Sequence, residues 1–256
     1  MAPMIVVKTS TEVELMRRAG VLAAEALGEV ARAVRPGIAG KELDRIAEAY
    51  IRDHGAIPSF LGYRGFPASI CLSIDDAVVH GIPGSRRLKE GEIASVDLGV
   101  ILDGFHGDTA VTVPVGRVAK TLQRLLTVTH ESLYKGIEVV HPGRRLGDVG
   151  AAIQRHVEAA GFSVVRDFAG HGIGRLLHEE PQVPNFGEGG TGIVLREGMT
   201  LAIEPMVNAG TAAVMMDHDE WTIRTRDGKA SAHFEHTVAV TAEGALVLTQ
   251  ISGGIV

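Results

Sequence analysis

Residues 93–113 read IASVDLGVILDGFHGDTAVTV, and this stretch decides the fold. Two runs rich in β-branched and other apolar residues flank Asp103-Gly104, a dipeptide that favours a two-residue hairpin turn with positive φ. If the strands pair about this turn without a bulge, each position has a fixed partner on the other strand. The important pairs are Asp97 with Ala110 and Asp108 with Gly99. The sequence therefore predicts a long antiparallel hairpin.

The two aspartates of this hairpin are expected on the same face. Side chains alternate between faces with a period of two, so Asp97 and Asp108 become diagonal neighbours with Cβ atoms roughly 7 Å apart. Gly107 beside Asp108, and Gly99 opposite it, leave room for another group to approach the backbone. Two carboxylates on one apolar face do not both stay ionised without a neutralising cation. We therefore expect the hairpin to form half of a metal site.

The composition is that of an ordinary globular protein. Of the 256 residues, 45% are apolar and 22% are charged, which is enough apolar material for a large core. The net charge is −6 and the basic residues are scattered, so nothing indicates a nucleic-acid or anionic-membrane surface. Cys71 is the single cysteine, which excludes an intrachain disulfide and a CxxC zinc site. With no signal peptide and no apolar run of membrane-spanning length, we expect a cytoplasmic protein.

The helical pattern occurs twice. Apolar periodicity predicts helices over about residues 11–34 and 41–54, and again over about 119–140 and 148–160. The residues that stop these helices recur at a spacing of 106, as Pro36 with Pro142, Gly37 with Gly143, and Gly55 with Gly161. We therefore expect one α+β domain over residues 1–256, with an internal duplication of about 11–113 and 118–241. Its two pseudo-symmetric helix–helix–sheet halves would carry the helices outside and a site between the sheets.

Three more acidic or imidazole side chains interrupt apolar or glycine-rich segments in the second half. His171 lies in GHGIG (170–174), and Glu204 ends the apolar run of LAIEP (201–205). Glu235 lies in SAHFEHTVAV (231–240), which is predicted as one strand with His233 on the face of Glu235 and His236 on the opposite face.

Each of these residues alone is more simply a loop or strand-end residue, and only the set indicates a metal site. Buried carboxylates are costly unless a cation is near, and no lysine or arginine lies close by in these strands. Four carboxylates and one imidazole form an oxygen-rich donor set that suits two divalent ions with bridging carboxylates, and not a structural zinc site. The members are Asp97, Asp108, His171, Glu204 and Glu235. Water bound to such an ion has its pKa lowered from 15.7 to about 7, which makes it a nucleophile at neutral pH.

In this order, and with these neighbours, the residues resemble those of type I methionine aminopeptidase. The shared motifs are DGFHGDT (103–109), GHGIG (170–174), IEPM (203–206) and EHT (235–237), with HGIP at His80 and HEEP at His178. The resemblance runs from about residue 5 to 250. With neither a zinc-binding N-terminal extension nor the insertion of type II enzymes, the chain is similar to the short bacterial form.

The resemblance implies the pita-bread fold and a metal-dependent hydrolase. Such an enzyme removes the N-terminal methionine from nascent proteins and peptides that have a small second residue. The implied partners are therefore peptide and nascent-protein N-termini, with a transient contact to the ribosome. We expect a monomer.

The resemblance also implies which residue binds which ion. Asp97 would bind one divalent metal ion, and Asp108 and Glu235 would bind both. His171 and Glu204 would bind the other ion. The donor set accepts cobalt, manganese, iron, zinc or nickel.

Three residues are implied to act on the substrate. Glu204 would carry a proton from the bridging water to the leaving amine. His178 would lie near the scissile carbonyl and His80 near the scissile amide nitrogen. His106 and His233 are further candidates for supporting a ligand by hydrogen bonding, a role that the sequence leaves open.

A narrow apolar pocket that tolerates a thioether would select methionine. The positions that match the family's substrate pocket are Tyr63, Phe66, Cys71, His80, Leu177, His178 and Trp221. Phe66 and Leu177 stand where some members have tyrosine and phenylalanine. We expect this difference to alter the rim of the pocket and to keep methionine binding.

Two alternatives stay open at the level of the sequence. Prolidases and aminopeptidase P share the fold and the ligand set, but usually carry a separate N-terminal domain for which 256 residues leave no room. A catalytically inactive pita-bread protein that only binds peptides would be expected to lose ligands, whereas all five are present here.

Overall fold

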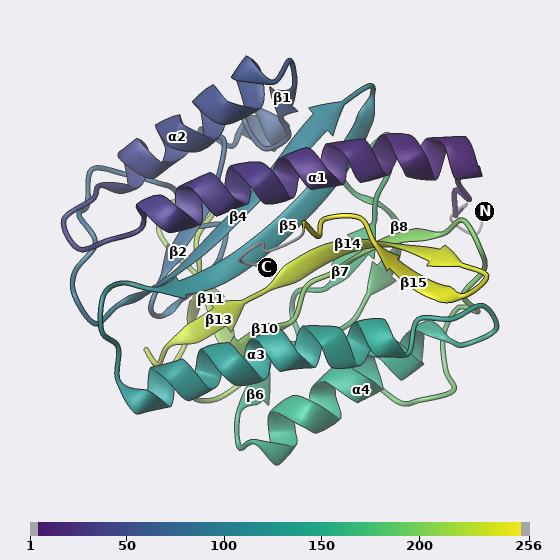
Figure 1. Cartoon of the computed structure of the whole chain (residues 1–256). Coiled ribbons are helices and arrows are strands. Elements are labelled where there is room, and N and C mark those ends of the chain that lie inside the picture. The colour runs from purple at the N-terminus through teal and green to yellow at the C-terminus, as the bar shows by residue number, and fades with distance from the viewer. Residues whose placement is uncertain (1–4, 252–256) are drawn as a thin grey trace.

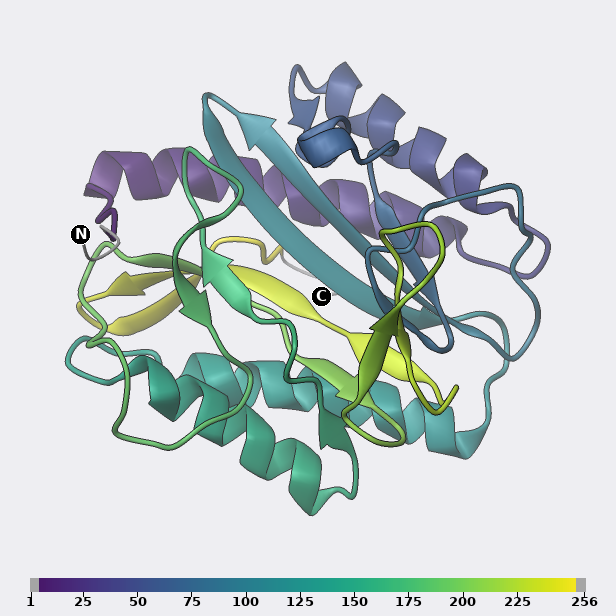
Figure 2. The ribbon, with the colours of Figure 1, turned by 180° about the vertical axis from the view of Figure 1, so that it is seen from behind.

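The computed structural model describes residues 5–251. Within this range, the α-helices lie against one face of a large antiparallel sheet, and loops and short strands lie on the opposite side (Figures 1 and 2). The helices are α1 (Ser10–Ala33), α2 (Gly40–Asp53), α3 (Lys120–Glu138) and α4 (Leu146–Ala159). This arrangement confirms the predicted α+β class. Within residues 5–251, no helix is long and apolar enough to cross a membrane.

Nine strands form the large sheet, in the order β1-β4-β5-β14-β9-β7-β8, with β2 also paired to β4 and β15 to β14. Their bounds are β1 Ile57–Pro58, β2 Cys71–Ile74, β4 Ile93–Leu102, β5 Phe105–Pro114, β7 Gly170–Gly172, β8 Glu179–Val183, β9 Thr200–Ile203, β14 Glu235–Thr241 and β15 Gly244–Val247. Two three-stranded sheets have the orders β13-β10-β6 and β11-β12-β3. Their strands are β3 Ala77–Val79, β6 Ser163–Val164, β10 Met206–Asn208, β11 Val214–Met216, β12 Ile223–Thr225 and β13 Ser231–His233.

The hairpin of β4 and β5 has the predicted register. Its pairs include Asp97 with Ala110 and Asp108 with Gly99. At the turn, Asp103 and Gly104 have φ values of 52° and 76°, which is the left-handed backbone that this two-residue turn requires. The register follows from the turn because a hairpin without a bulge has no freedom to slip.

The two glycines near Asp108 make room for other parts of the protein. A Cβ atom on Gly107 would lie 2.6 Å from the backbone of Gly20, so the missing side chain lets α1 pack directly on β5. A Cβ atom on Gly99 would lie 2.8 Å from the Cβ of Ser59. Because Gly107 faces α1, the alternation of side chains turns Asp108 toward the face that has no helices.

The core lies between the helices and the large sheet. Its fully buried side chains include Leu27, Leu43, Leu133 and Ile153 from the four helices, and Val96 from β4. Burying one such side chain is worth about 1.5–3 kcal/mol. The helices therefore hold the sheet as a rigid platform, and its other face is left for a site.

The two helix pairs correspond as the sequence predicted. The bounds of α2 and α4 differ by 106 residues at both ends, and each of the four predicted helices ends within two residues of its prediction. Gly37 and Gly143 have φ values of 89° and 85°, and Gly55 and Gly161 have 74° and 80°. These correspondences support the internal duplication, which stays a prediction together with the single domain.

The prediction of one strand over residues 231–240 is wrong. The chain leaves the small sheet after His233, passes through Phe234, and joins the large sheet at Glu235, because β13 pairs with β10 whereas β14 pairs with β5 and β9. The segment beside it also changes sheets at this level, because Glu204-Pro205 separates β9 of the large sheet from β10 of the small sheet. Glu204 and Glu235 consequently lie together at the junction of the two sheets.

Candidate metal centre

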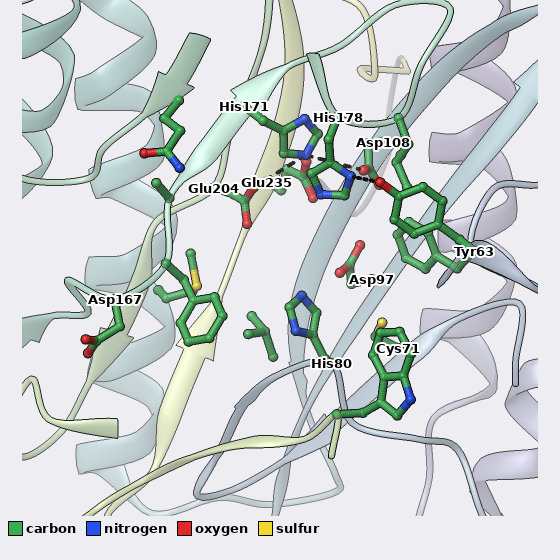
Figure 3. A pocket seen from close by; sticks show the side chains of 18 of the residues that line it. Tyr63, Cys71, His80, Asp97, Asp108, Asp167, His171, His178, Glu204 and Glu235 are labelled. Carbon is green, nitrogen blue, oxygen red and sulfur yellow. Dashed lines mark hydrogen bonds and ion pairs between the residues drawn. The ribbon is translucent and has the colours of Figure 1, made fainter. Parts of the chain in front are cut away.

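A cavity of about 520 Å³ lies at this junction. All the site residues that the sequence predicted line it: Tyr63, Phe66, Cys71, His80, Asp97, Asp108, His171, Leu177, His178, Glu204, Trp221 and Glu235. They come from both halves of the chain, and those that Figure 3 labels surround one space.

The carboxylates and the imidazole converge inside this cavity (Figure 3). Asp108, His171 and Glu235, from β5, β7 and β14, offer ligand atoms that all lie within 4.8 Å of one another. The Nε2 atom of His171 is 4.0 Å from Oδ2 of Asp108 and 3.7 Å from Oε1 of Glu204. Asp97 and Glu204 line the same cavity but lie outside this closest group of three.

Several buried oxygen atoms of this group have no hydrogen-bond partner among residues 5–251. They are Oδ1 of Asp97, Oδ1 of Asp108 and Oε1 of Glu235. Leaving a buried charged acceptor without a partner is unfavourable by several kcal/mol in order of magnitude. A divalent cation held by these oxygens would remove that cost, so the donor set fits the predicted metal centre.

The pKa values of the carboxylates are raised in the metal-free protein. Burial raises the pKa of Glu204 to about 8. Burial, and then the charge of Glu204, raises the pKa of Asp108 to about 8. Burial and the neighbouring carboxylates hold the pKa of Asp97 and of Glu235 well above the usual range. Four such groups in one place need a compensating positive charge in order to be ionised at neutral pH.

His171 is oriented to act as a ligand through Nε2. Its Nδ1 atom lies 2.9 Å from the carbonyl oxygen of Gly172, which can only accept, so the Nδ1–H group donates. This hydrogen bond leaves the lone pair on Nε2, on the side of Asp108 and Glu204. Burial, and then the neighbouring His178, lowers the pKa of His171 to about 3, which keeps the ring neutral.

The two other predicted histidines lie near this group. The rings of His178 and His171 have centroids 4.1 Å apart, and Nδ1 of His178 lies 2.9 Å from the hydroxyl oxygen of Tyr63. Burial, and then the charge of Arg64, lowers the pKa of His178. Burial, and then His233 and His178, lowers the pKa of His80 to about 4.

An apolar wall adjoins the polar groups. Phe66, Cys71 and Leu177 are buried, and Trp221 meets Phe66 edge to face with ring centroids 5.1 Å apart. Burial, and then the charge of Asp97, raises the pKa of Cys71 well above its usual range, so the thiol is neutral. This wall has the character of the apolar pocket that the sequence predicted.

The histidines whose role the sequence left open lie close to the site. Nε2 of His233 is 3.5 Å from Oε2 of Glu204, so His233 shares the face of the ligands as predicted. His106 is paired with Ser59, whose Oγ lies 2.9 Å from its Nδ1. His236 points to the opposite face as predicted, where the Tyr134 hydroxyl lies 3.0 Å from its Nε2.

Sequence reasoning missed several residues that line the cavity. They are Phe60, Arg64, Val79, Arg166, Asp167, Phe168, Ala169, Gln182, Pro184, Phe186 and Met206. Phe60 and Arg64 lie in the same glycine- and aromatic-rich loop as Tyr63, so their position along the chain was a usable signal. The missed residues between 166 and 186 belong to none of the motifs that drew attention to His171 and His178 in the same range.

The raised pKa values predict how the stability of the metal-free protein depends on pH. Asp108 and Glu204 have folded pKa values of about 8, above those of the unfolded chain, so the folded state binds more protons and loses stability as pH rises. His171 and His233 act oppositely, but only between about 3 and their unfolded value of 6.5. Between pH 6.5 and 8.5, the free energy of unfolding in chelator should therefore fall by roughly 1 kcal/mol per pH unit or more. Thermal unfolding should show this as a falling melting temperature. A flat or rising melting temperature would contradict the clustering of the carboxylates.

Comparisons with known proteins agree with this geometry. The model of metallopeptidase family M24 matches residues 14–242. A methionine aminopeptidase from Clostridium perfringens is 53% identical over 248 residues, which are 97% of this chain and 100% of the relative. The crystal structure of methionine aminopeptidase from Rickettsia prowazekii has a TM-score of 0.95 at 47% identity, covering 96% of this chain and 100% of that one. These likenesses confirm the predicted pita-bread fold.

A prolidase from Pyrococcus horikoshii is more distant. Its structure has a TM-score of 0.76 at 20% identity, and the match covers 97% of this chain and 65% of that one. A likeness at this identity shows the fold alone. It gives no support to the prolidase alternative.

Proposed function

The chain belongs to the methionine aminopeptidases of metallopeptidase family M24, and from this premise we propose how its cavity cleaves the first peptide bond of a substrate. The predicted resemblance is thereby confirmed, and the chain is a metal-dependent hydrolase that acts on peptide N-termini. We propose how many ions the cavity binds, which residues are their ligands, and how the other side chains act on the substrate.

We assign two divalent ions to the five converging residues. Asp97 would hold one ion, and His171 and Glu204 would hold the other. Asp108 and Glu235 would serve as ligands to both. The short distances among Asp108, His171 and Glu235, and the unpartnered oxygens around them, support this assignment. When bound, divalent ions supply Lewis acidity for the scissile carbonyl, an activated water at neutral pH and a site for the free α-amine.

We propose that Glu204 transfers a proton during the reaction. Its side chain is only 14% exposed, and its Oε2 atom lies 3.5 Å from Nε2 of His233. A carboxylate at this position can accept a proton from the attacking water and deliver it to the leaving amine. Without that transfer the amine would leave as an unstable anion.

His178 and His80 act on the substrate as neutral imidazoles. The lowered pKa of each ring keeps it uncharged near pH 7. When the Tyr63 hydroxyl donates to Nδ1 of His178, the proton of that ring is on Nε2, where it can donate to the scissile carbonyl oxygen. His80 is proposed to lie beside the scissile amide nitrogen.

The apolar wall binds the methionine side chain. Phe66, Leu177 and Trp221 offer surfaces on which a thioether packs well, and the neutral thiol of Cys71 adds a small polarizable group. A charged or long polar first residue would lose its hydration there without gaining a partner, because these walls offer no ionic group. The pocket therefore favours methionine.

The observation that carries the proposal is the convergence of Asp108, His171 and Glu235 beside this apolar wall. The test compares release of the first residue from Met-Ala-Ser and from an Ala-Pro peptide, in protein reconstituted without oxygen with each candidate metal. We expect methionine release and no cleavage before proline. Cleavage of the Ala-Pro peptide without methionine release would favour the prolidase alternative instead.

We also propose that the protein is a monomer, that it is located in the cytoplasm and that it contacts the ribosome transiently. Its metal is proposed to be cobalt, manganese, iron, zinc or nickel. Reconstitution with one metal at a time, followed by the same assay, decides among these metals.

A further inference from the structure

A buried ion pair joins Lys8 and Glu179, neither of which lines the cavity. Nζ of Lys8 is 2.5 Å from Oε2 of Glu179, and the two side chains are only 3% and 8% exposed. Within residues 5–251, no other basic side chain lies within 4.0 Å of the Glu179 carboxylate. Because both charges are desolvated, each depends on the other.

The two ends belong to segments that are far apart in the sequence. Lys8 precedes α1, and its N–H group donates to the carbonyl oxygen of Gly198 over 2.8 Å. Glu179 directly follows His178, and its Oε1 atom accepts a hydrogen bond from the N–H group of Leu176 over 3.2 Å. The carboxylate thus closes a short loop over residues 174–179, and this loop carries two groups that line the cavity, Leu177 and His178.

Gly174 lets this ion pair pack closely against the loop. A Cβ atom on Gly174 would lie 2.5 Å from Oε1 of Glu179 and 2.5 Å from Cε of Lys8. The carbonyl oxygen of Gly174 accepts a hydrogen bond from the N–H group of His106 over 2.8 Å. The loop against which the ion pair packs is therefore tied by this hydrogen bond to β5, the hairpin strand that carries Asp108.

We propose that Lys8 is a positioning residue, whose ammonium group fixes Glu179 and thereby holds the imidazole of His178 over the cavity. This inference rests on the proposed function, since Lys8 is proposed to position His178 and His178 is proposed to act in methionine release. The ammonium acts at a distance, because it touches neither the substrate pocket nor a metal ligand. Its effect travels through Glu179 and the backbone of the loop.

The test is a cycle of two substitutions, Lys8→Met and His178→Ala, assayed for methionine release from Met-Ala-Ser. Methionine keeps the length of the lysine stem and removes its charge. We expect Lys8→Met to lower kcat by about 10- to 100-fold, as a displacement of roughly 1 Å can do, with KM changed less than about twofold. In the His178→Ala background, the same substitution should cost almost nothing more, because the group that it misplaces is already missing.

A merely structural role gives a different result. It would lower kcat by the same factor in both backgrounds, and that result, or an unchanged kcat in the single variant, would overturn the proposal. If Lys8→Met does not fold, Lys8→Gln gives the same cycle with a smaller amplitude, since glutamine can still hydrogen-bond to Glu179. If the unsubstituted protein releases no methionine, the proposed function fails first, and the two failures are thereby distinguished.

Arg175→Met is the matched control. Arg175 lies on the same loop and forms an ion pair with Glu12 over 3.4 Å, but its side chain is 63% exposed. An exposed pair contributes little because water screens it. We expect less than about a twofold change in kcat for this variant, so a large loss on Lys8→Met cannot come from the loss of any basic group near the loop.

Discussion

Replacing Glu204 with glutamine is expected to lower kcat for methionine release by about 10³-fold while the melting temperature changes little. Glutamine keeps the shape of the side chain but cannot accept a proton and is a poor metal ligand. The neutral amide should be tolerated, because burial already raises the pKa of Glu204 to about 8 and the metal-free protein holds this group largely uncharged at pH 7. The function is therefore lost without a loss of fold.

Kinetics and thermal unfolding of the same preparation check this expectation. His218→Gln is a suitable control, because His218 lies on the exposed loop that follows β11 and does not line the cavity. Near-normal kcat in Glu204→Gln would remove Glu204 from the reaction. A collapsed melting temperature would show instead that the carboxylate is needed for folding.

Replacing Asp108 with asparagine should remove most of the activity by weakening metal binding. Asp108 belongs to the closest group of ligand atoms, and its Oδ1 atom has no partner within residues 5–251. The hydroxyl of Thr237 holds its main chain on both sides, accepting from the N–H group over 3.0 Å and donating to the carbonyl oxygen over 2.8 Å. The substitution therefore removes a charge without moving the strand.

The expected loss in kcat/KM is on the order of 10³-fold, because a bound ion is worth several kcal/mol in the transition state and about 1.36 kcal/mol corresponds to tenfold in rate. The metal-free variant should be at least as stable as the unsubstituted protein at pH 8, since one of four crowded carboxylates is gone. Calorimetric titration with Mn²⁺ measures the affinity, and thermal unfolding in chelator measures the stability. Unchanged Mn²⁺ affinity would contradict the role of Asp108.

Asp103→Asn is the matched control for this variant. Asp103 lies at the turn of the same hairpin, with its side chain 42% exposed and 2.8 Å from Arg18. Asparagine tolerates the left-handed backbone at this position, where φ is 52°. Neither metal affinity nor kcat should change measurably.

The sequence predicted the parts of the fold that local chemistry determines. The turn at Asp103-Gly104 fixes the register of the hairpin, and that register is enough to bring Asp97 and Asp108 to one face. The helix ends followed from glycines at 37, 55, 143 and 161, each with a positive φ that other residues adopt only with strain. Such signals lie within a few residues of the feature that they determine.

Other features depend on contacts between distant segments and left no local signal. The change of sheet at Phe234 arises because its two flanking strands have different partners, β10 on one side and β9 with β5 on the other. The bond between Tyr63 and His178 and the ion pair between Lys8 and Glu179 join residues more than 100 positions apart. A single sequence does not contain the register of such pairs.

The composition of the site was more predictable than its geometry. Carboxylates in apolar strands are costly, so Asp97, Asp108 and Glu235 stood out in the sequence, and all three line one cavity. The sequence did not predict that Asp108, His171 and Glu235 form a tighter group than the remaining two ligands. That difference comes from how β5, β7 and β14 meet, which the hairpin alone does not determine.

Two bound ions can be located most directly by diffraction from crystals grown with Mn²⁺ and recorded near the manganese absorption edge. We expect two anomalous peaks in the cavity, one beside Asp97 and one beside His171 and Glu204, with Asp108 and Glu235 near both. A single peak, or peaks outside the cavity while these carboxylates stay unliganded, would contradict this expectation.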